Sequence, residues 1–366
     1  MTKINARVEK FVSNMNDLQY DVFVIASKEN IKYLFGHSFN TGNRISAAII
    51  NSKGETHFLL NKIFTNQLEV TSGMNIHYYQ DGDNIVGKIG SLVPINSFVG
   101  IDKGINLITY FEIVNSRSDI KLQLSDCIER LREIKDEEEI NLLRQSSRIS
   151  DAVMHQIVQL LQHPTTERTI GQTIGNFFEG YGITDLTFKP IVACGENTVN
   201  PHHVPGDRFI RDNEPLLIDM GCIYKGYCSD MTRMFGMTGV DELFLSYYEY
   251  LQEAQRSVLE IIKPGIELRE IDFFTREYLK KRNLDSHFIH SLGHGIGLEG
   301  HEYPYIHSQN KEIVKEGMVI TVGPGIYLDG KFGLRIEDVI CITKGGYENL
   351  NNSTKELVLL DYQSIL

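Results

Sequence analysis

The sequence predicts a two-domain protein of the α/β (α+β) class. Its 366 residues exceed what a single typical hydrophobic core accommodates. Up to about residue 130, helical patterns alternate with short apolar runs, as in a small α/β domain. From about Ile134 the pattern becomes that of one long amphipathic helix. We therefore place the domain boundary near residue 132, which gives domains 1–132 and 133–366.

Three short strands are expected in the first domain. The run Tyr20–Ser27 is apolar and rich in β-branched residues, and Ala47–Ile50 and His57–Leu60 are similar. The second domain should begin with a helix whose apolar residues recur every three or four positions. Its acidic start, Asp136–Glu139, suits the positive end of the helix dipole, so we interpret these charges as capping.

The rest of the second domain combines strands, helices and a glycine-rich loop. Helical patterns cover residues 241–262 and 268–281, and the loop spans residues 293–300. Strands are expected at Pro215–Ile223, Tyr227–Phe235, 318–322 and 333–343. The first two of these strands should form a hairpin, because only a short Tyr-Lys-Gly segment separates them.

The composition excludes several classes of protein. A hydrophobic fraction of 42% and a charged fraction of 23% are ordinary for a globular chain. The net charge of −12 argues against nucleic acid as a partner. The N-terminal sequence has no apolar signal core and no later run is long enough to span a membrane, so we expect a cytoplasmic protein without a membrane partner.

The five cysteines form no CxxC pair, which disfavours a disulfide framework and a thiolate zinc site. They are most simply small buried apolar residues. Cys194 is a candidate nucleophile by its loop-like surroundings, but no histidine stands at a recognisable partner spacing.

Asp219 and Asp230 lie one on each strand of the expected hairpin. Their positions are symmetric about a turn at Tyr224 and Lys225, so they should face each other. Two opposed carboxylates destabilise a hairpin unless a cation lies between them. The alternative is a different register in which each aspartate is solvated or caps a turn. We favour the paired arrangement because both lie in otherwise apolar strand sequence.

His294 lies in a glycine-rich segment together with two further histidines, His290 and His301. The glycines allow the backbone to approach a site closely. Three histidines in this setting favour a site lined with imidazole, either for metal ligation or for proton transfer. A purely structural cluster is the alternative.

Glu337 and Arg335 should share one face of the strand at 333–343, since side chains alternate along a strand. Taken alone, this pair would be read as a surface ion pair. Together with the two aspartates and His294, however, Glu337 completes three carboxylates and an imidazole. Divalent manganese, cobalt, zinc or iron accepts this ligand set. A metal pair there would support hydrolysis, with His202, His203 and Arg335 as candidates for proton transfer or substrate binding.

At this point the chain resembles the pita-bread-fold metallopeptidases, specifically Xaa-Pro dipeptidases and Xaa-Pro aminopeptidases of the creatinase/prolidase type. The resemblance covers nearly the whole chain, and its motifs occur in the family's order. They are SKENIKYLFG, LREIKDEEEINLLR, GENTVNPHH, LLIDMG, SDMTRMF, HSLGHGIGLEGHE and GLRIEDV.

The resemblance implies a creatinase-like N-terminal α/β domain and a C-terminal pita-bread domain, with a curved antiparallel sheet and covering helices. It implies that Asp219 binds one metal, that Asp230 and Glu337 bridge two, and that His294 binds the second. His202, His301 and Arg335 would be catalytic, and these three together with His290 would bind substrate. Relatives hydrolyse the bond between an N-terminal residue and proline, usually with manganese or cobalt and as homodimers; zinc is a further alternative.

One position departs from the family pattern. Thr321-Val322-Gly323-Pro324-Gly325 carries glycine where the family has a glutamate ligand. Because glycine offers no side-chain oxygen, the second metal site should be weaker. The same family glutamate also handles protons, so activity is in question.

The leading hypothesis is an Xaa-Pro peptidase with an impaired metal site, and the alternative is a catalytically inactive peptide-binding homologue. A metal-independent amidinohydrolase similar to creatinase is disfavoured because such enzymes do not keep this ligand set. A methionine aminopeptidase is disfavoured because it would not need the N-terminal domain.

Overall fold

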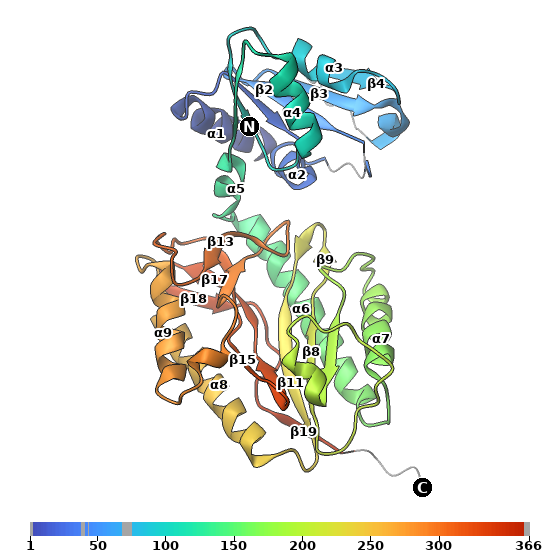
Figure 1. The fold of residues 1–366 in the computed structure, drawn as a ribbon, viewed down its shortest axis with the longest axis vertical. Coiled ribbons are helices and arrows are strands. Elements are labelled where there is room, and N and C mark those ends of the chain that lie inside the picture. Colours follow the sequence, from blue (N-terminus) through green and yellow to red (C-terminus); the bar gives the residue numbers. More distant parts are fainter. Residues whose placement is uncertain (1–2, 38–40, 43, 68–74, 362–366) are drawn as a thin grey trace. The chain divides into compact units, whose positions relative to one another are not determined.

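The computed structural model describes residues 3–37, 41–42, 44–67 and 75–361. The chain forms two compact units, Met1–Arg132 and Glu133–Leu366. Figure 1 shows their helices and strands.

The first unit contains one mixed sheet. Its strands are β1 (Val22–Ile25), β2 (Ala47–Asn51), β3 (Thr56–Asn61), β4 (Asn75–Tyr79), β5 (Phe98–Ile101) and β6 (Lys121–Leu124). They lie in the order β4-β3-β2-β1-β5-β6, and β1 pairs antiparallel with β2 and parallel with β5. The helices are α1 (Lys3–Asp17), α2 (Lys28–Phe35), α3 (Ile85–Ser91), α4 (Leu107–Ser116) and α5 (Cys127–Arg132). The three strands expected from the sequence are confirmed as β1, β2 and β3.

The second unit begins with α6 (Glu137–Leu160), and its acidic start caps the helix as expected. The Asp136 carboxylate accepts hydrogen bonds from the backbone N–H groups of Glu138 and Glu139, while the Glu139 carboxylate accepts one from the backbone N–H of Asp136. This reciprocal arrangement satisfies backbone donors that the first turn of a helix leaves free.

The described part of the second unit also contains three more α-helices, two short 3₁₀ helices (Gly195–Val199 and Asp285–His287) and thirteen strands. The helices are α7 (Glu167–Gly180), α8 (Glu242–Ile261) and α9 (Leu268–Lys280). The strands are β7 (Ile191–Cys194), β8 (Pro215–Met220), β9 (Ile223–Tyr224), β10 (Tyr227–Cys228), β11 (Met231–Met237), β12 (Gly293–Gly295), β13 (Glu302–Ile306), β14 (Val319–Val322), β15 (Gly325–Leu328), β16 (Phe332–Arg335), β17 (Asp338–Thr343), β18 (Gly346–Asn349) and β19 (Val358–Leu360).

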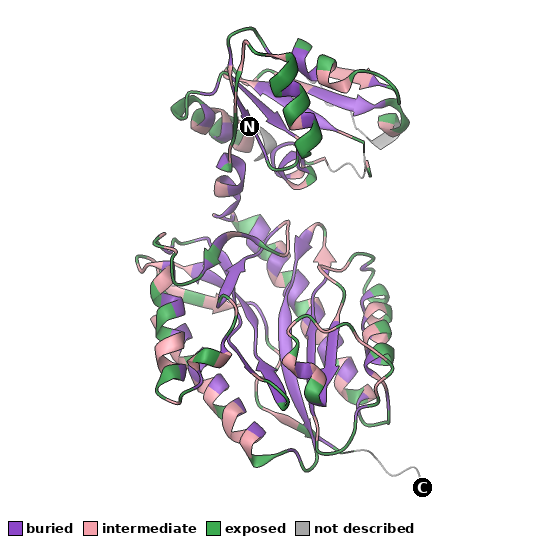
Figure 2. Cartoon of the chain, viewed as in Figure 1, coloured by how far each residue is buried: buried purple, intermediate pink, exposed green. Residues whose placement is uncertain are grey.

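Two sheets dominate this unit, one in the order β19-β11-β8-β7 and one in the order β13-β12-β14-β17-β18. One hydrophobic core joins α6 and α7 to β7, β8 and β11, and a second joins α8 and α9 to β14, β16 and β17. The strands between these helices are buried, whereas each helix exposes one side (Figure 2). The predicted class, with mostly antiparallel sheets covered by helices, is confirmed. Among the described helices, none combines the length and the apolar character that a membrane crossing needs.

The hairpin that carries the two aspartates has a different register from the predicted one. Asp219 lies opposite Thr232, two residues beyond Asp230. The turn is centred on Lys225 and Gly226, one residue later than expected, and their φ angles are 49° and 90°. Positive φ at both central residues matches the twist of a two-residue hairpin. Asp219 and Asp230 therefore lie diagonally on the same face of the hairpin, and the prediction that they are directly opposed is wrong.

Replacing Gly226 by alanine is expected to destabilise the second unit by about 1 kcal/mol, because a Cβ atom disfavours positive φ. The midpoint of urea unfolding measures this loss. Gly345→Ala is the matched control, since Gly345 is not at positive φ and no atom lies within 4 Å of an added Cβ. An equal loss in both variants would contradict a requirement for glycine in the turn.

Candidate metal centre

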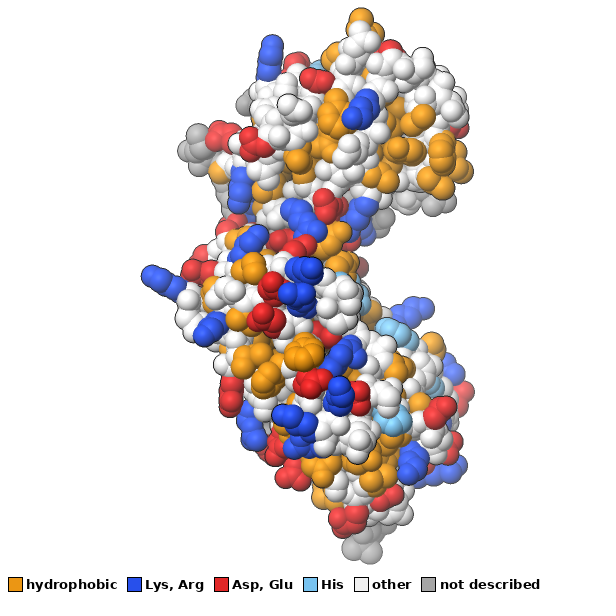
Figure 3. Space-filling view, turned by 60° about the vertical axis from the view of Figure 1, so that its left-hand side comes forward, with side chains coloured by type: hydrophobic (Ala, Val, Ile, Leu, Met, Phe, Trp, Pro, Cys, Tyr) orange, Lys and Arg blue, Asp and Glu red, His pale blue; other side chains and the backbone are white. Residues whose placement is uncertain are grey.

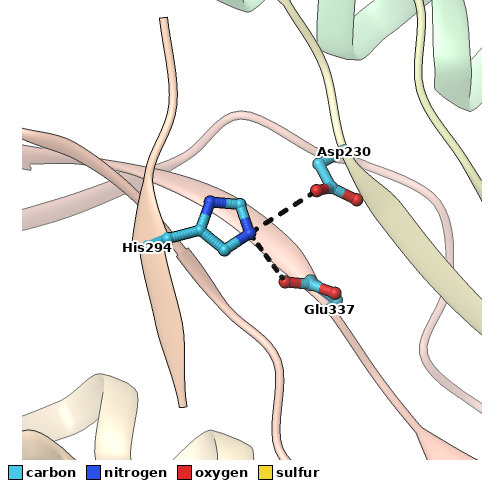
Figure 4. A group of neighbouring side chains, drawn as sticks. All are labelled: Asp230, His294 and Glu337. Atoms are coloured by element: carbon cyan, nitrogen blue, oxygen red, sulfur yellow. Dashed lines mark ion pairs between the residues drawn. The ribbon is translucent and has the colours of Figure 1, made fainter. Parts of the chain in front are cut away.

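Asp230, His294 and Glu337 converge at one buried point (Figure 4). Nε2 of His294 lies 3.8 Å from Oδ2 of Asp230 and 4.0 Å from Oε1 of Glu337. One potential ligand atom from each residue lies within 4.8 Å of the other two. Asp230 directly precedes β11, His294 lies on β12, and Glu337 connects β16 to β17. Segments far apart in the sequence thus bring together three of the four predicted ligands.

The fourth predicted ligand, Asp219 on β8, is held by Arg335. Nη2 of Arg335 donates a hydrogen bond to Oδ2 of Asp219 at 2.6 Å. The same guanidinium donates to Oγ1 of Thr232 at 3.0 Å, to the Tyr327 hydroxyl at 3.0 Å and to the Pro201 carbonyl at 3.2 Å. Arg335 thereby fixes one carboxylate oxygen of Asp219 and leaves the other, Oδ1, unbound to it.

The carboxylates repel one another. Burial raises the pKa of Asp219 to about 6, and the charge of Glu337 adds to this shift although Arg335 opposes it. Burial and the charges of Glu337 and Asp219 raise the pKa of Asp230 well above its ordinary value. Within the described residues, Oδ1 of Asp219 and Oδ1 of Asp230 are buried without a hydrogen-bond partner. A divalent cation would pair with such oxygens and offset the repulsion, so the residues fit a metal centre.

His294 is oriented to bind a metal through Nε2. Its Nδ1 lies 3.0 Å from the Gly295 carbonyl, to which it donates, and burial together with the charge of His301 lowers its pKa to about 3. A neutral imidazole with a free Nε2 is the form that ligates metals.

The glycines around His294 allow close backbone packing, and Gly293 also lines the cavity into which the cluster opens. A Cβ on Gly293 would lie 2.0 Å from the Thr321 carbonyl oxygen, and one on Gly295 would lie 2.1 Å from that of Tyr303. The missing side chains therefore allow β12 to lie close against its neighbouring segments. This close packing places the His294 ring in the cluster.

The cluster opens into a cavity of about 600 Å³ that His202, His290, His301 and Arg335 also line. His202 and His301 are exposed, and Figure 3 shows histidine side chains at the surface of this unit. The ring of His301 lies over that of His294, with centroids 3.8 Å apart. All four predicted pocket residues therefore lie around the same cavity.

His290 differs from the other two pocket histidines because the protein engages both of its ring nitrogens. Nε2 lies 3.0 Å from the Tyr327 hydroxyl and Nδ1 lies 2.8 Å from the Ser291 carbonyl. Burial lowers the pKa of His290 to about 4. It is therefore a neutral, fixed wall of the cavity.

The alternative of a surface ion pair at Arg335 and Glu337 is wrong, because the two residues are only 5% and 8% exposed. The continuous strand expected at 333–343 is also wrong. β16 ends at Arg335 and β17 begins at Asp338, so Glu337 lies in the break. Nε of Arg335 still lies 3.8 Å from Oε2 of Glu337, which places both side chains on the same side.

Gly323 lies directly against the Glu337 carboxylate. A Cβ built on Gly323 would lie 2.6 Å from Cδ and 2.7 Å from Oε1 of Glu337. The Glu337 carboxylate therefore occupies space that a side chain at position 323 would need. Glycine at 323 both omits an oxygen ligand and permits this position of Glu337.

Sequence reasoning missed two residues that support the ligands. Thr232 and Tyr327 both accept hydrogen bonds from Arg335, and Tyr327 also contacts His290. Pairing across strands, which only the true hairpin register gives, would have revealed Thr232. The proposed nucleophile Cys194 is fully buried, and burial raises its pKa to about 12, which favours the structural interpretation. All five cysteines are buried and free, as expected.

The sequence matches two family models. Residues 7–134 match the creatinase/prolidase N-terminal domain, and residues 141–344 match metallopeptidase family M24. The chain belongs to metallopeptidase family M24. It is 34% identical over 360 residues to an uncharacterized peptidase of Staphylococcus aureus, an alignment that covers 97% of this chain and 100% of that protein.

Solved structures of the same family have the same fold. A prolidase from Thermococcus sibiricus is 31% identical with a TM-score of 0.93, and the match covers 98% of this chain and 100% of the other. An Xaa-Pro dipeptidase from Bacillus anthracis is 27% identical with a TM-score of 0.88 and the same coverage. The predicted family is therefore confirmed.

Asp230→Asn is expected to stabilise the metal-free protein by roughly 1–3 kcal/mol, because it removes a buried, repelled charge. The melting temperature in a chelator measures this gain. The same variant should lose the stabilisation that manganese gives the parent chain. Asp207→Asn is the control, since Asp207 is exposed. If manganese raises the melting temperatures of Asp230→Asn and the parent chain equally, Asp230 is not a ligand.

Proposed function

We propose that this protein is a metal-dependent peptidase that hydrolyses the bond between an N-terminal residue and a following proline. The observation that carries the proposal is the buried Asp230-His294-Glu337 cluster beside Asp219, at a cavity lined by further histidines. The prolidase and Xaa-Pro dipeptidase among the similar structures support the choice of substrate. Small peptides with proline at the second position are the proposed substrates.

Two divalent ions are the proposed cofactors, with manganese first and cobalt or zinc as alternatives. Asp219, Asp230 and Glu337 would hold one ion, and His294, Asp230 and Glu337 the other. When bound, such a pair lowers the pKa of a water and polarises a carbonyl. We also propose a cytoplasmic homodimer.

The chain's own side chains supply orientation and proton transfer. Arg335 keeps Asp219 in place, and the hydrogen bond from Nδ1 of His294 to Gly295 keeps Nε2 directed at the two carboxylates. His202 and His301 are exposed at the cavity, where an imidazole can hold a peptide carbonyl or exchange a proton. Catalysis by these residues and by Arg335 is part of the proposal.

The test combines metal analysis with hydrolysis of Xaa-Pro dipeptides and longer Xaa-Pro peptides in the presence of manganese. Turnover with bound metal is the expected result. Failure to turn over any of these peptides, together with less than one bound metal per chain, would reject the proposal. The ratio of the rates on dipeptides and on longer peptides distinguishes a dipeptidase from an aminopeptidase.

A catalytically inactive peptide-binding homologue is the second candidate, and Gly323 is the observation that favours it. The missing oxygen weakens the side of the centre that His294 occupies, because among the described residues Asp230 and Glu337 alone accompany the histidine there. Appreciable activity of the unmodified chain rejects this candidate.

Gly323→Glu is expected to raise metal affinity at least about tenfold and to raise kcat. About tenfold is the smaller of the losses in metal affinity that mutations around a metal site typically cause. Calorimetric titration with manganese and peptide hydrolysis measure the two effects. Gly323→Ala is the matched control, because its Cβ displaces Glu337 in the same way but supplies no oxygen. An equal gain in both variants would show that the position of Glu337, rather than a new ligand, limits the centre.

A further inference from the structure

Glu167, in the first turn of α7, is a fully buried carboxylate outside the proposed metal centre. Its Oε1 accepts hydrogen bonds from the backbone N–H of Cys194 at 2.9 Å and from Nδ2 of Asn197 at 2.8 Å. Its Oε2 accepts from the backbone N–H of Gly206 at 3.0 Å and lies 2.8 Å from Nε2 of His203. Four groups of residues 194–206, the last residue of β7 and the loop that follows it, thus converge on a single side chain.

The same loop lines the cavity. Pro201, His202 and His203 are among the residues that form its wall, and each lies between the two ends that Glu167 holds. The first turn of α7 in turn donates backbone hydrogen bonds to the end of this loop and to the residues just after it. The backbone N–H of Glu167 donates to the Arg208 carbonyl at 3.1 Å, and that of Arg168 donates to the Gly206 carbonyl at 2.9 Å. The loop therefore takes its position from the first turn of α7.

Glu167 is ionised in this setting. Burial alone would raise its pKa, but the hydrogen bonds from Asn197, His203 and the loop backbone outweigh burial and lower it. An ionised carboxylate only accepts hydrogen bonds. Nε2 of His203 must therefore carry a hydrogen, which it donates to Glu167. Nδ1 is the ring nitrogen that remains for a hydrogen bond to another group.

We propose that Glu167 is a positioning residue for peptide binding, which orients His203 and holds the 194–206 loop against the cavity. The inference rests on the proposed peptidase function, because it assigns the loop to the substrate. A side chain that serves only to stabilise the fold would leave the affinity for peptide unchanged once the protein is folded.

Glu167→Gln is the decisive variant. Glutamine has only one accepting oxygen, so its NH₂ group must face either the donors of Cys194 and Asn197 or those of Gly206 and His203. We expect KM for Xaa-Pro peptides to rise about tenfold with kcat nearly unchanged, because one buried charge-assisted contact is lost. Arg168→Ala is the matched control. It removes an ion pair to Asp207, the residue directly after this loop, but both partners are exposed, so KM should stay within about threefold.

The state of the His203 ring gives a readout that needs no turnover. In ¹⁵N-histidine-labelled protein, Nε2 of His203 should carry a hydrogen in the parent, and Nε2 should lose it in Glu167→Gln molecules whose amide NH₂ faces the ring. His203→Gln assigns the signal. It also supplies a second kinetic test that keeps the other three bonds of Glu167, should Glu167→Gln fail to fold.

The outcomes separate this inference from the peptidase proposal. A raised KM in Glu167→Gln and His203→Gln, but not in Arg168→Ala, supports the positioning role. An unchanged KM overturns it, and so does a His203 ring whose Nε2 carries no hydrogen in the parent. If the parent chain hydrolyses no peptide, the peptidase proposal fails. Titration with alanyl-proline then replaces KM, and a Kd that is the same in the parent and Glu167→Gln overturns the positioning role.

Discussion

The crowding of three carboxylates in one buried place is the constraint on which the second unit depends. Asp219, Asp230 and Glu337 would repel one another and separate if nothing opposed their charges. Arg335 opposes this from one side by binding Asp219. Its own orientation comes from Thr232, Tyr327 and the Pro201 carbonyl, which accept hydrogen bonds from its other N–H groups. The strands and loops that carry these residues are fixed by the same contacts.

A second arginine acts behind the centre. Arg233 donates to the Glu337 carbonyl at 2.9 Å and to the buried Asp338 carboxylate at 2.6 Å. Burial alone would raise the pKa of Asp338, but the charges of Arg233 and Lys355 hold it below its ordinary value. Glu337 thus lies between one arginine that reaches its carboxylate and another that holds its backbone. Such support from outside the ligands fixes their geometry.

Local patterns predicted much of this protein because its signals are strong in the sequence. The amphipathic period of α6 and the acidic residues at its start fix a helix with a capping box, whatever lies around it. The register of the hairpin was missed because one shift of the turn, to Lys225 and Gly226, moves every cross-strand pair. From the sequence alone we expected the turn at Tyr224 and Lys225, because Asp219 and Asp230 are symmetric about that position.

The burial of Glu337 and Arg335 was beyond local reasoning for a related reason. In a sequence, an acid and a base two residues apart look the same whether their strand is exposed or buried. Only the segments that pack around the strand determine which of the two it is. The role of Glu167 was hidden in the same way, because an acid in the first turn of a helix is ordinarily a capping charge. The resemblance to a known family predicted what the individual residues could not, namely that motifs far apart in the sequence form one site.

The backbone of Glu337 pairs with that of Thr232 in both directions, with N–O distances of 3.2 and 3.3 Å, although Glu337 belongs to neither neighbouring strand. This short bridge joins the β8–β11 half of the unit to the half that carries β12, β14 and β17. Asp219 and Asp230 come from the first half and His294 and Glu337 from the second. An ion held among these four residues would link the two halves of the unit. Local separation of the two halves would then have to release the ion. The concentration of free metal would therefore set how often the halves separate.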